Sequence, residues 1–132
     1  MLVPCEVAVK CALPAIRAMI AKELMMHYKL RQADAAKLLG VSQPAISLYS
    51  RRMRGKAIDL ENDSEIRSLT EELAGRLFEG DLPHVKFISD FCQVCKKIRA
   101  KGLLCKMHRT FDSSIDIEKC GLCASTDLTR CT

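Results

Sequence analysis

Six residues in the C-terminal half of the chain are spaced as metal ligands. They follow the pattern Cys92-x2-Cys95-x9-Cys105-x2-His108-x11-Cys120-x2-Cys123. Each C-x2-C pair can place both sulfurs on the same side of a metal ion. The N-terminal residues lack the basic start and the cleavage site of a signal peptide, so we expect a reducing, cytoplasmic location. There, clustered cysteines bind metals more often than they form disulfides, and the pattern predicts a metal-binding segment.

Two ligand sets remain open for this segment. A tetrahedral zinc ion needs four ligands, which the two C-x2-C pairs supply. A [4Fe–4S] cluster held by the first pair, Cys105 and one cysteine of the last pair is the other solution. His108 is a candidate further ligand because of its C-x2-H spacing. The remaining cysteines, Cys5, Cys11 and Cys131, lack such spacing, and we expect them to be structural or incidental. Nearby cations could offset the charge of either group: Lys96, Lys97, Arg99, Lys101, Lys106 and Arg109.

The elements that must position these residues are predicted to be helices, because apolar residues recur at three- and four-residue steps and no strand pattern is convincing. Pro14 is expected to open the first helix. Gly40 ends the second, and Ser42 caps the third. A fourth is expected to begin near Asn62, with Glu65 completing a capping box. The expected helices are 14–27, 31–39, 43–52, 62–79 and 83–101.

Residues 32–51, QADAAKLLGVSQPAISLYSR, hold a set of positions with clear physical requirements. A small side chain at Ala36 lets two helices cross closely. Gly40 lies in a turn that needs a backbone angle unfavourable for other residues. Val41 and Ile46 are spaced to fill the core between the helices, with Ala35 and Leu39 packing from the first helix. The stretch therefore predicts two short helices in close contact.

This stretch resembles the helix-turn-helix of the Cro and phage-repressor type. Tyr49 departs mildly from that pattern, since an aliphatic residue is usual there, and Pro44 replaces the usual polar residue. The resemblance implies a lambda-repressor-like all-α bundle, with the helix from Gln43 onward lying in the major groove of DNA. Gln43 would read bases through its amide, and Gln32 would brace it and contact phosphate. Further implied contacts are Ser42 and Ser47 to phosphate or bases, and the basic tail Arg51, Arg52, Arg54 and Lys56 to phosphates.

From about residue 12 to 125, the chain resembles predicted archaeal transcriptional regulators that join such a helix-turn-helix to a cysteine-rich C-terminal region. The stretches that carry this likeness are QADAAKLLGVSQPAISLYSRRMRG, CQVCKKIRAKGLLCKMH and CGLC. We expect a DNA-binding domain at 12–60, a connecting or dimerisation helix at 61–82 and a metal-binding module at 83–132. The resemblance implies a homodimer on double-stranded DNA.

Charge is distributed in agreement with this division. Residues 1–60 carry a net charge of +6, residues 61–80 carry −4 and residues 81–132 carry +3. A basic first block favours a polyanionic partner, and an acidic outer face on 62–79 would repel DNA and help to orient the basic helices toward it. The apolar face of 62–79 is open to two interpretations: it completes the core, or it forms a dimer seam.

Other function classes are less favoured. The apolar runs are too short to span a bilayer. No phosphate loop and no nucleophile–base pair is apparent, so neither an enzyme nor a small-molecule substrate is expected. Two alternatives remain: a small redox or electron-transfer metalloprotein, and a zinc-knuckle adaptor of the transcription machinery. In the favoured interpretation the metal biases DNA affinity, and an iron–sulfur cluster would make the protein a redox sensor.

Overall fold

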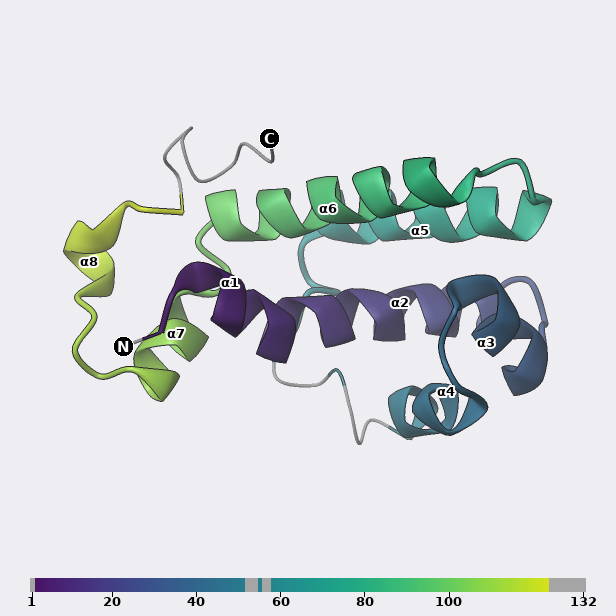
Figure 1. Cartoon of the computed structure of the whole chain (residues 1–132), viewed down its shortest axis with the longest axis horizontal. Helices are drawn as coiled ribbons and strands as arrows, with labels where there is room; N and C mark the ends of the chain where they lie inside the picture. Colours follow the sequence, from purple (N-terminus) through teal and green to yellow (C-terminus); the bar gives the residue numbers. More distant parts are fainter. Residues whose placement is uncertain (1, 52–54, 56–57, 124–132) are drawn as a thin grey trace.

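The computed structural model describes residues 2–51, 55 and 58–123. In this part of the chain every regular element is a helix, which confirms the all-α prediction (Figure 1). No helix there is long and apolar enough to cross a membrane. The elements are α1 (Pro4–Val7), η1 (Ala8–Ala12), α2 (Leu13–Met26), α3 (Gln32–Leu39), α4 (Gln43–Ser50), α5 (Ser64–Glu79), α6 (His84–Ala100), α7 (Cys105–Phe111) and α8 (Ile117–Cys120).

The first three elements form one continuous helical rod from Pro4 to Met26 (Figure 1). The predicted helix is α2, which begins at Leu13 with Pro14 in its first turn, but the chain before it is already helical, so Pro14 lies within a longer rod. Proline in a helix interior lacks an N–H donor and its ring collides with the carbonyl four residues before it. The preceding turn, η1, is a π-helix, whose wider spacing accommodates such an interruption. Pro4 takes the first helical position instead.

Helices α3 and α4 form the predicted pair. Gly40 follows α3 with φ 72°, the left-handed conformation that glycine adopts without steric cost. Ser42 then caps α4, its hydroxyl oxygen accepting a hydrogen bond from the Ala45 N–H at 3.2 Å. Both predictions are confirmed, and the turn between the helices is only a few residues long.

Helix α5 packs lengthwise against α2. Its N-cap is Asp63, whose carboxylate accepts from the Ile66 N–H at 3.0 Å, so the predicted cap at Asn62 was wrong by one residue. The apolar face, with Ile66, Leu73 and Leu77, is buried within the chain. This supports the first interpretation of that face: these residues complete the core of the chain.

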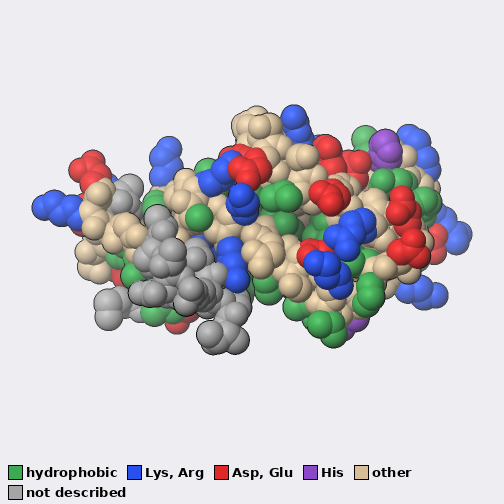
Figure 2. Space-filling model, turned by 90° about the horizontal axis from the view of Figure 1, so that it is seen from above, with side chains coloured by type: hydrophobic (Ala, Val, Ile, Leu, Met, Phe, Trp, Pro, Cys, Tyr) green, Lys and Arg blue, Asp and Glu red, His purple; other side chains and the backbone are tan. Residues whose placement is uncertain are grey.

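Ion pairs join α5 to α6 along their outer surface. Lys101 lies 2.9 Å from Asp63 and 2.8 Å from Glu65, and Arg76 lies 2.6 Å from Asp90. The cap hydrogen bond from Ile66, then Lys101, lowers the pKa of Asp63. Hydrogen bonds from Lys101 and Lys97 lower the pKa of Glu65. Blue and red side chains are accordingly interspersed on this face (Figure 2), which leaves little excess of either sign.

Candidate functional site

The N-terminal end of α4 presents polar side chains to solvent. Ser42, Gln43 and Pro44 are all exposed. Ser42 uses its oxygen to cap the helix, which leaves its hydroxyl hydrogen able to donate to another acceptor. The Gln43 amide can donate and accept hydrogen bonds at once. It is therefore available to a partner at the N-terminal end of α4.

The opposite face of α4 is anchored in the core. Ile46 is 0% exposed and Tyr49 is 8% exposed. Ala35, Ala36 and Leu39 of α3 are also buried, as expected for two helices that cross closely. Both helices contact α2. This packing holds α4 in place with its N-terminal residues, including Gln43, exposed.

The other predicted DNA contacts lie near these helices. Gln32 is half-buried at the first residue of α3, and Ser47 is half-buried in α4. The Ser47 carbonyl accepts from the Arg51 backbone N–H at 3.1 Å, and Arg51 itself is exposed. The predicted contacts Arg52, Arg54 and Lys56 lie outside the described residues.

Helix α4 lies on the opposite side of α2 from α5 and α6 (Figure 1). Helix α5, which carries Glu71, Glu72 and Glu79, therefore lies across α2 from α4 (Figure 1). Repulsion between an acidic surface and a polyanion decreases with distance and with screening by salt. A polyanion in front of α4 would therefore meet the carboxylates of α5 only across the thickness of α2 (Figure 1).

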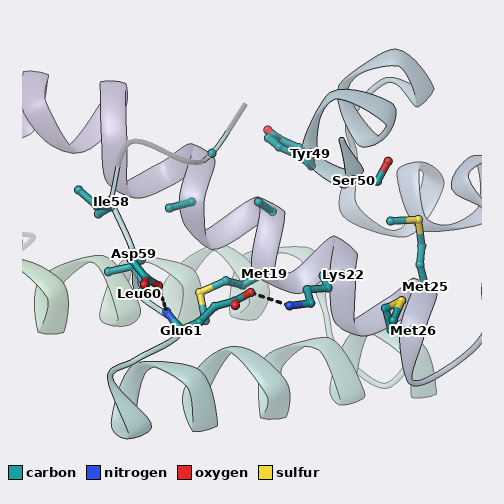
Figure 3. A pocket seen from close by; sticks show the side chains of 13 residues that line it. Met19, Lys22, Met25, Met26, Tyr49, Ser50, Ile58, Asp59, Leu60 and Glu61 are labelled. Carbon is teal, nitrogen blue, oxygen red and sulfur yellow. Dashed lines mark hydrogen bonds and ion pairs between the residues drawn. The ribbon is translucent and has the colours of Figure 1, made fainter. Parts of the chain in front are cut away.

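A cavity of about 520 Å³ borders the C-terminal end of α4 (Figure 3). Tyr49 and Ser50 face it from α4, and Met19 and Met25 face it from α2. At its edge, the Lys22 ammonium lies 3.0 Å from the Glu61 carboxylate. The last turn of α4 thus borders open volume.

The predicted metal ligands are distributed over three elements. Cys92 is exposed and Cys95 half-buried, both on α6. Cys105 begins α7 and is half-buried, Cys120 ends α8 and is exposed, and Cys123 follows it, half-buried. Among the described residues, no three His, Cys, Asp or Glu side chains converge closely enough to hold a metal ion.

A second cavity, of about 210 Å³, nevertheless brings part of this set together. Its lining includes Cys105, His108, Cys120 and Cys123 but neither Cys92 nor Cys95. Burial raises the pKa of the Cys123 thiol, and a hydrogen bond from Arg99 acts in the opposite direction. Four of the six candidate ligands therefore line one cavity.

Of the remaining cysteines, Cys11 is buried in the core, where burial raises the pKa of its thiol. Cys5 is exposed, and Cys131 lies outside the described residues. The expectation of a structural role fits Cys11, because a thiol in an apolar environment stays protonated and packs as a small apolar group.

Two side chains of the α7 region hold the N-terminus of the chain. The Leu2 N–H donates to the Asp112 carboxylate at 3.0 Å, and the Leu2 carbonyl accepts from His108 Nε2 at 2.7 Å. Hydrogen bonds from Ser114 and from Leu2 lower the pKa of Asp112 to about 2. Sequence analysis missed this clamp. The two partners are 110 and 106 positions from Leu2, and no local pattern reveals such pairings.

Comparison of the chain with family models, with curated proteins and with solved structures found no match.

Proposed function

We propose that this protein is a sequence-specific DNA-binding transcriptional regulator, with α3 and α4 as a lambda-repressor-like helix-turn-helix. The observation that carries the proposal is the exposed N-terminal end of α4, with Gln43 in solvent, above a face anchored by Ile46. An α-helix fits the major groove, and helices in this arrangement meet base edges with their first residues.

The roles of the side chains follow from their chemistry. The Gln43 amide would donate to and accept from an adenine edge together. The Ser42 hydroxyl, Ser47, Gln32 and Arg51 would contact phosphates or base edges near both helices. Arg52, Arg54 and Lys56, which follow α4 in sequence, would add phosphate contacts. Two copies related by a two-fold axis would read half-sites about 34 Å apart.

The cysteine-rich segment adds a metal in this proposal, either zinc or an iron–sulfur cluster. The donor types fit both, since thiolates and imidazole bind zinc and cysteines hold iron–sulfur clusters. The candidate ligands are Cys92, Cys95, Cys105, Cys120 and Cys123, with His108. When bound, zinc would supply a structural cross-link, whereas a cluster would supply a redox-sensitive one.

Fluorescence anisotropy with a labelled random-sequence duplex, measured over a salt series, tests the proposal. We expect binding that weakens with salt, followed by enrichment of a defined sequence when the protein selects from a random duplex library. Protein that binds no duplex even at low salt would refute the proposal. A coloured, redox-active protein without duplex binding would instead favour the electron-transfer alternative.

A further inference from the structure

The smaller cavity brings together a set of candidate ligands that differs from both sets the sequence leaves open. Cys105, His108, Cys120 and Cys123 all line it, whereas Cys92 and Cys95 do not. We propose that these four lining residues form a zinc site, and that the bound zinc fixes α7 against the N-terminal end of the helical rod that supports the DNA-binding helices. The second part rests on the proposed function; the first part does not.

The local backbone suits each pair of ligands. Cys105 and His108 are three residues apart at the start of α7, which places them on one face of the helix. Cys120 and Cys123 flank a turn in which Gly121 has φ 54°, a conformation that lets the chain reverse so that both sulfurs can point to one side. In the structure as it stands the four donors do not converge on one point, so the segments around the cavity of about 210 Å³ would have to close on the ion to reach the zinc–ligand distance of about 2.0–2.3 Å.

His108 is already held as zinc-binding histidines commonly are. Its Nε2 lies 2.7 Å from the Leu2 carbonyl, and because a carbonyl only accepts hydrogen bonds, Nε2 carries the proton. In the neutral ring the lone pair is then on Nδ1. A metal-binding histidine usually donates its other ring N–H to such a backbone carbonyl or to a carboxylate, which fixes the ring's orientation. The side chain is only 6% exposed.

Charge and donor type favour zinc over an iron–sulfur cluster at this place. A zinc ion bound by three thiolates and one neutral imidazole carries one net negative charge. The buried Arg99 guanidinium lines the same cavity and lies 4.0 Å from the sulfur of Cys5, so a cation is present beside the site. Three sulfurs and one nitrogen are a common structural zinc set, whereas a [4Fe–4S] cluster is usually held by four cysteines.

The site would be linked to the DNA-binding helices through the N-terminus. His108 and Asp112 hold Leu2 by its carbonyl and its N–H. Leu2 is followed by α1, η1 and α2 as one helical rod, and α2 contacts both α3 and α4. Zinc would order α7 and so keep this clamp closed, because ligand binding stabilises the conformation that binds it.

Metal analysis of purified variants tests the ligand set. We expect about one zinc per wild-type chain, a loss of most of that zinc in Cys105→Ser and in Cys120→Ser, and full retention in the double variant Cys92→Ser/Cys95→Ser. His108→Cys should keep zinc while His108→Ala loses it. Because both His108 variants lack the hydrogen bond to Leu2, this pair separates a ligand from a merely structural histidine. Zinc lost from the double variant, or iron in place of zinc, overturns the assignment.

Should a cysteine variant fail to fold, cobalt(II) substitution of the wild-type chain and of the double variant gives a second readout. Cobalt(II) in a tetrahedral thiolate site has intense visible absorption. We expect the same spectrum from both proteins. An altered or missing spectrum in the double variant would show that Cys92 or Cys95 is a ligand and would overturn the proposal.

Hydrogen exchange of residues 2–12, with zinc bound and after chelation, tests the coupling. We expect exchange to become at least about tenfold faster without zinc, and affinity for a random-sequence duplex to fall in parallel. If removal of zinc changes neither the exchange nor the affinity, the coupling is wrong, and the zinc count would still support the ligand set. Absence of duplex binding in the zinc-loaded protein would instead refute the proposed function and leave the zinc site intact.

Discussion

Gln43 and Ser42 are exposed, but their position in the molecule depends on buried residues nearby. The Gln43 side chain is in solvent and holds no part of the fold together, whereas Ile46, three residues on, is 0% exposed. The Ser42 hydroxyl begins the helix that carries both. Changes at Gln43 should therefore alter recognition without altering stability.

We expect Gln43→Ala to weaken binding to the selected duplex by about 1–3 kcal/mol, as for loss of one bidentate base contact, with an unchanged melting temperature. Anisotropy with that duplex and with a scrambled one measures the effect. Gln93→Ala is the matched control, because Gln93 is an exposed glutamine on α6. Equal losses in both variants, or none in either, would contradict the role given to Gln43.

Asp112 gives the clamp on Leu2 a defined pH dependence. Its pKa is about 2 in the folded chain, below the ordinary 3.8, so its stabilising effect is complete above about pH 4 and is lost as pH falls toward 2. We expect the Leu2 amide resonance in NMR spectra to shift over that window and to lose the transition in Asp112→Asn. Asp81→Asn, which changes an exposed carboxylate between α5 and α6, should leave the transition in place.

At the scale of elements, two glycines with similar backbone angles differ in their surroundings. Gly40 has φ 72° and nothing within 4 Å of an added Cβ. Gly55 has φ 79°, and an added Cβ would lie 2.7 Å from the Pro14 carbonyl oxygen and 2.8 Å from the Ala18 Cβ. The chain at Gly55 thus rests directly on the backbone of α2, whereas the turn at Gly40 is open.

Alanine at each glycine separates backbone strain from steric collision. Gly40→Ala should lower the free energy of unfolding by about 1–2 kcal/mol, the cost of the left-handed conformation. Gly55→Ala should cost about 1–3 kcal/mol more, because a backbone carbonyl cannot move aside as a side chain does. Urea denaturation measures both values. Similar losses of unfolding free energy in the two variants would show that the backbone of α2 shifts at Pro14 to make room for the added methyl group.

Packing of α4 against the other helices is concentrated at Ile46. We expect Ile46→Ala to lower the free energy of unfolding by about 2–5 kcal/mol, since the methyl groups it removes are buried and the neighbouring helices cannot fully collapse. Urea denaturation followed by circular dichroism gives the value. Leu48→Ala, at a half-buried position of the same helix, should cost clearly less.

At the scale of the whole molecule, most ion pairs among the described residues lie on the α5–α6 face. Residues 1–60 hold the largest positive excess, and α4 lies across α2 from the α5–α6 face (Figure 1). On that face the lysines are paired, with Lys97 2.7 Å from Glu65 and Lys86 2.9 Å from Asp90. The positive charges on that face are therefore largely neutralised locally and offer little to a polyanion.

Salt dependence of duplex binding should reveal this division. Changing Arg52, Arg54 and Lys56 together to Gln should reduce the slope of log affinity against log salt by about one for each charge that contacts a phosphate. The matched triple change of Lys86, Lys97 and Lys101 to Gln should leave the slope unchanged. A larger effect from the second set would place DNA on the α5–α6 face.

Residues close together in the sequence are enough to predict the local elements: Gly40 ends a helix, Ser42 caps α4, and apolar spacing indicates an all-helical structure. These features depend on residues that are neighbours in the sequence. The spacing of the candidate metal ligands can likewise be read from the sequence directly. Three other features follow from the packing of the whole chain. Pro14 lies inside a continuous rod, α2 covers the apolar face of α5, and one cavity is lined by Cys105, His108, Cys120 and Cys123 but not by Cys92 or Cys95. Each of those outcomes depends on which distant segments pack together, and this is set by the burial of the whole core rather than by any short stretch of the chain.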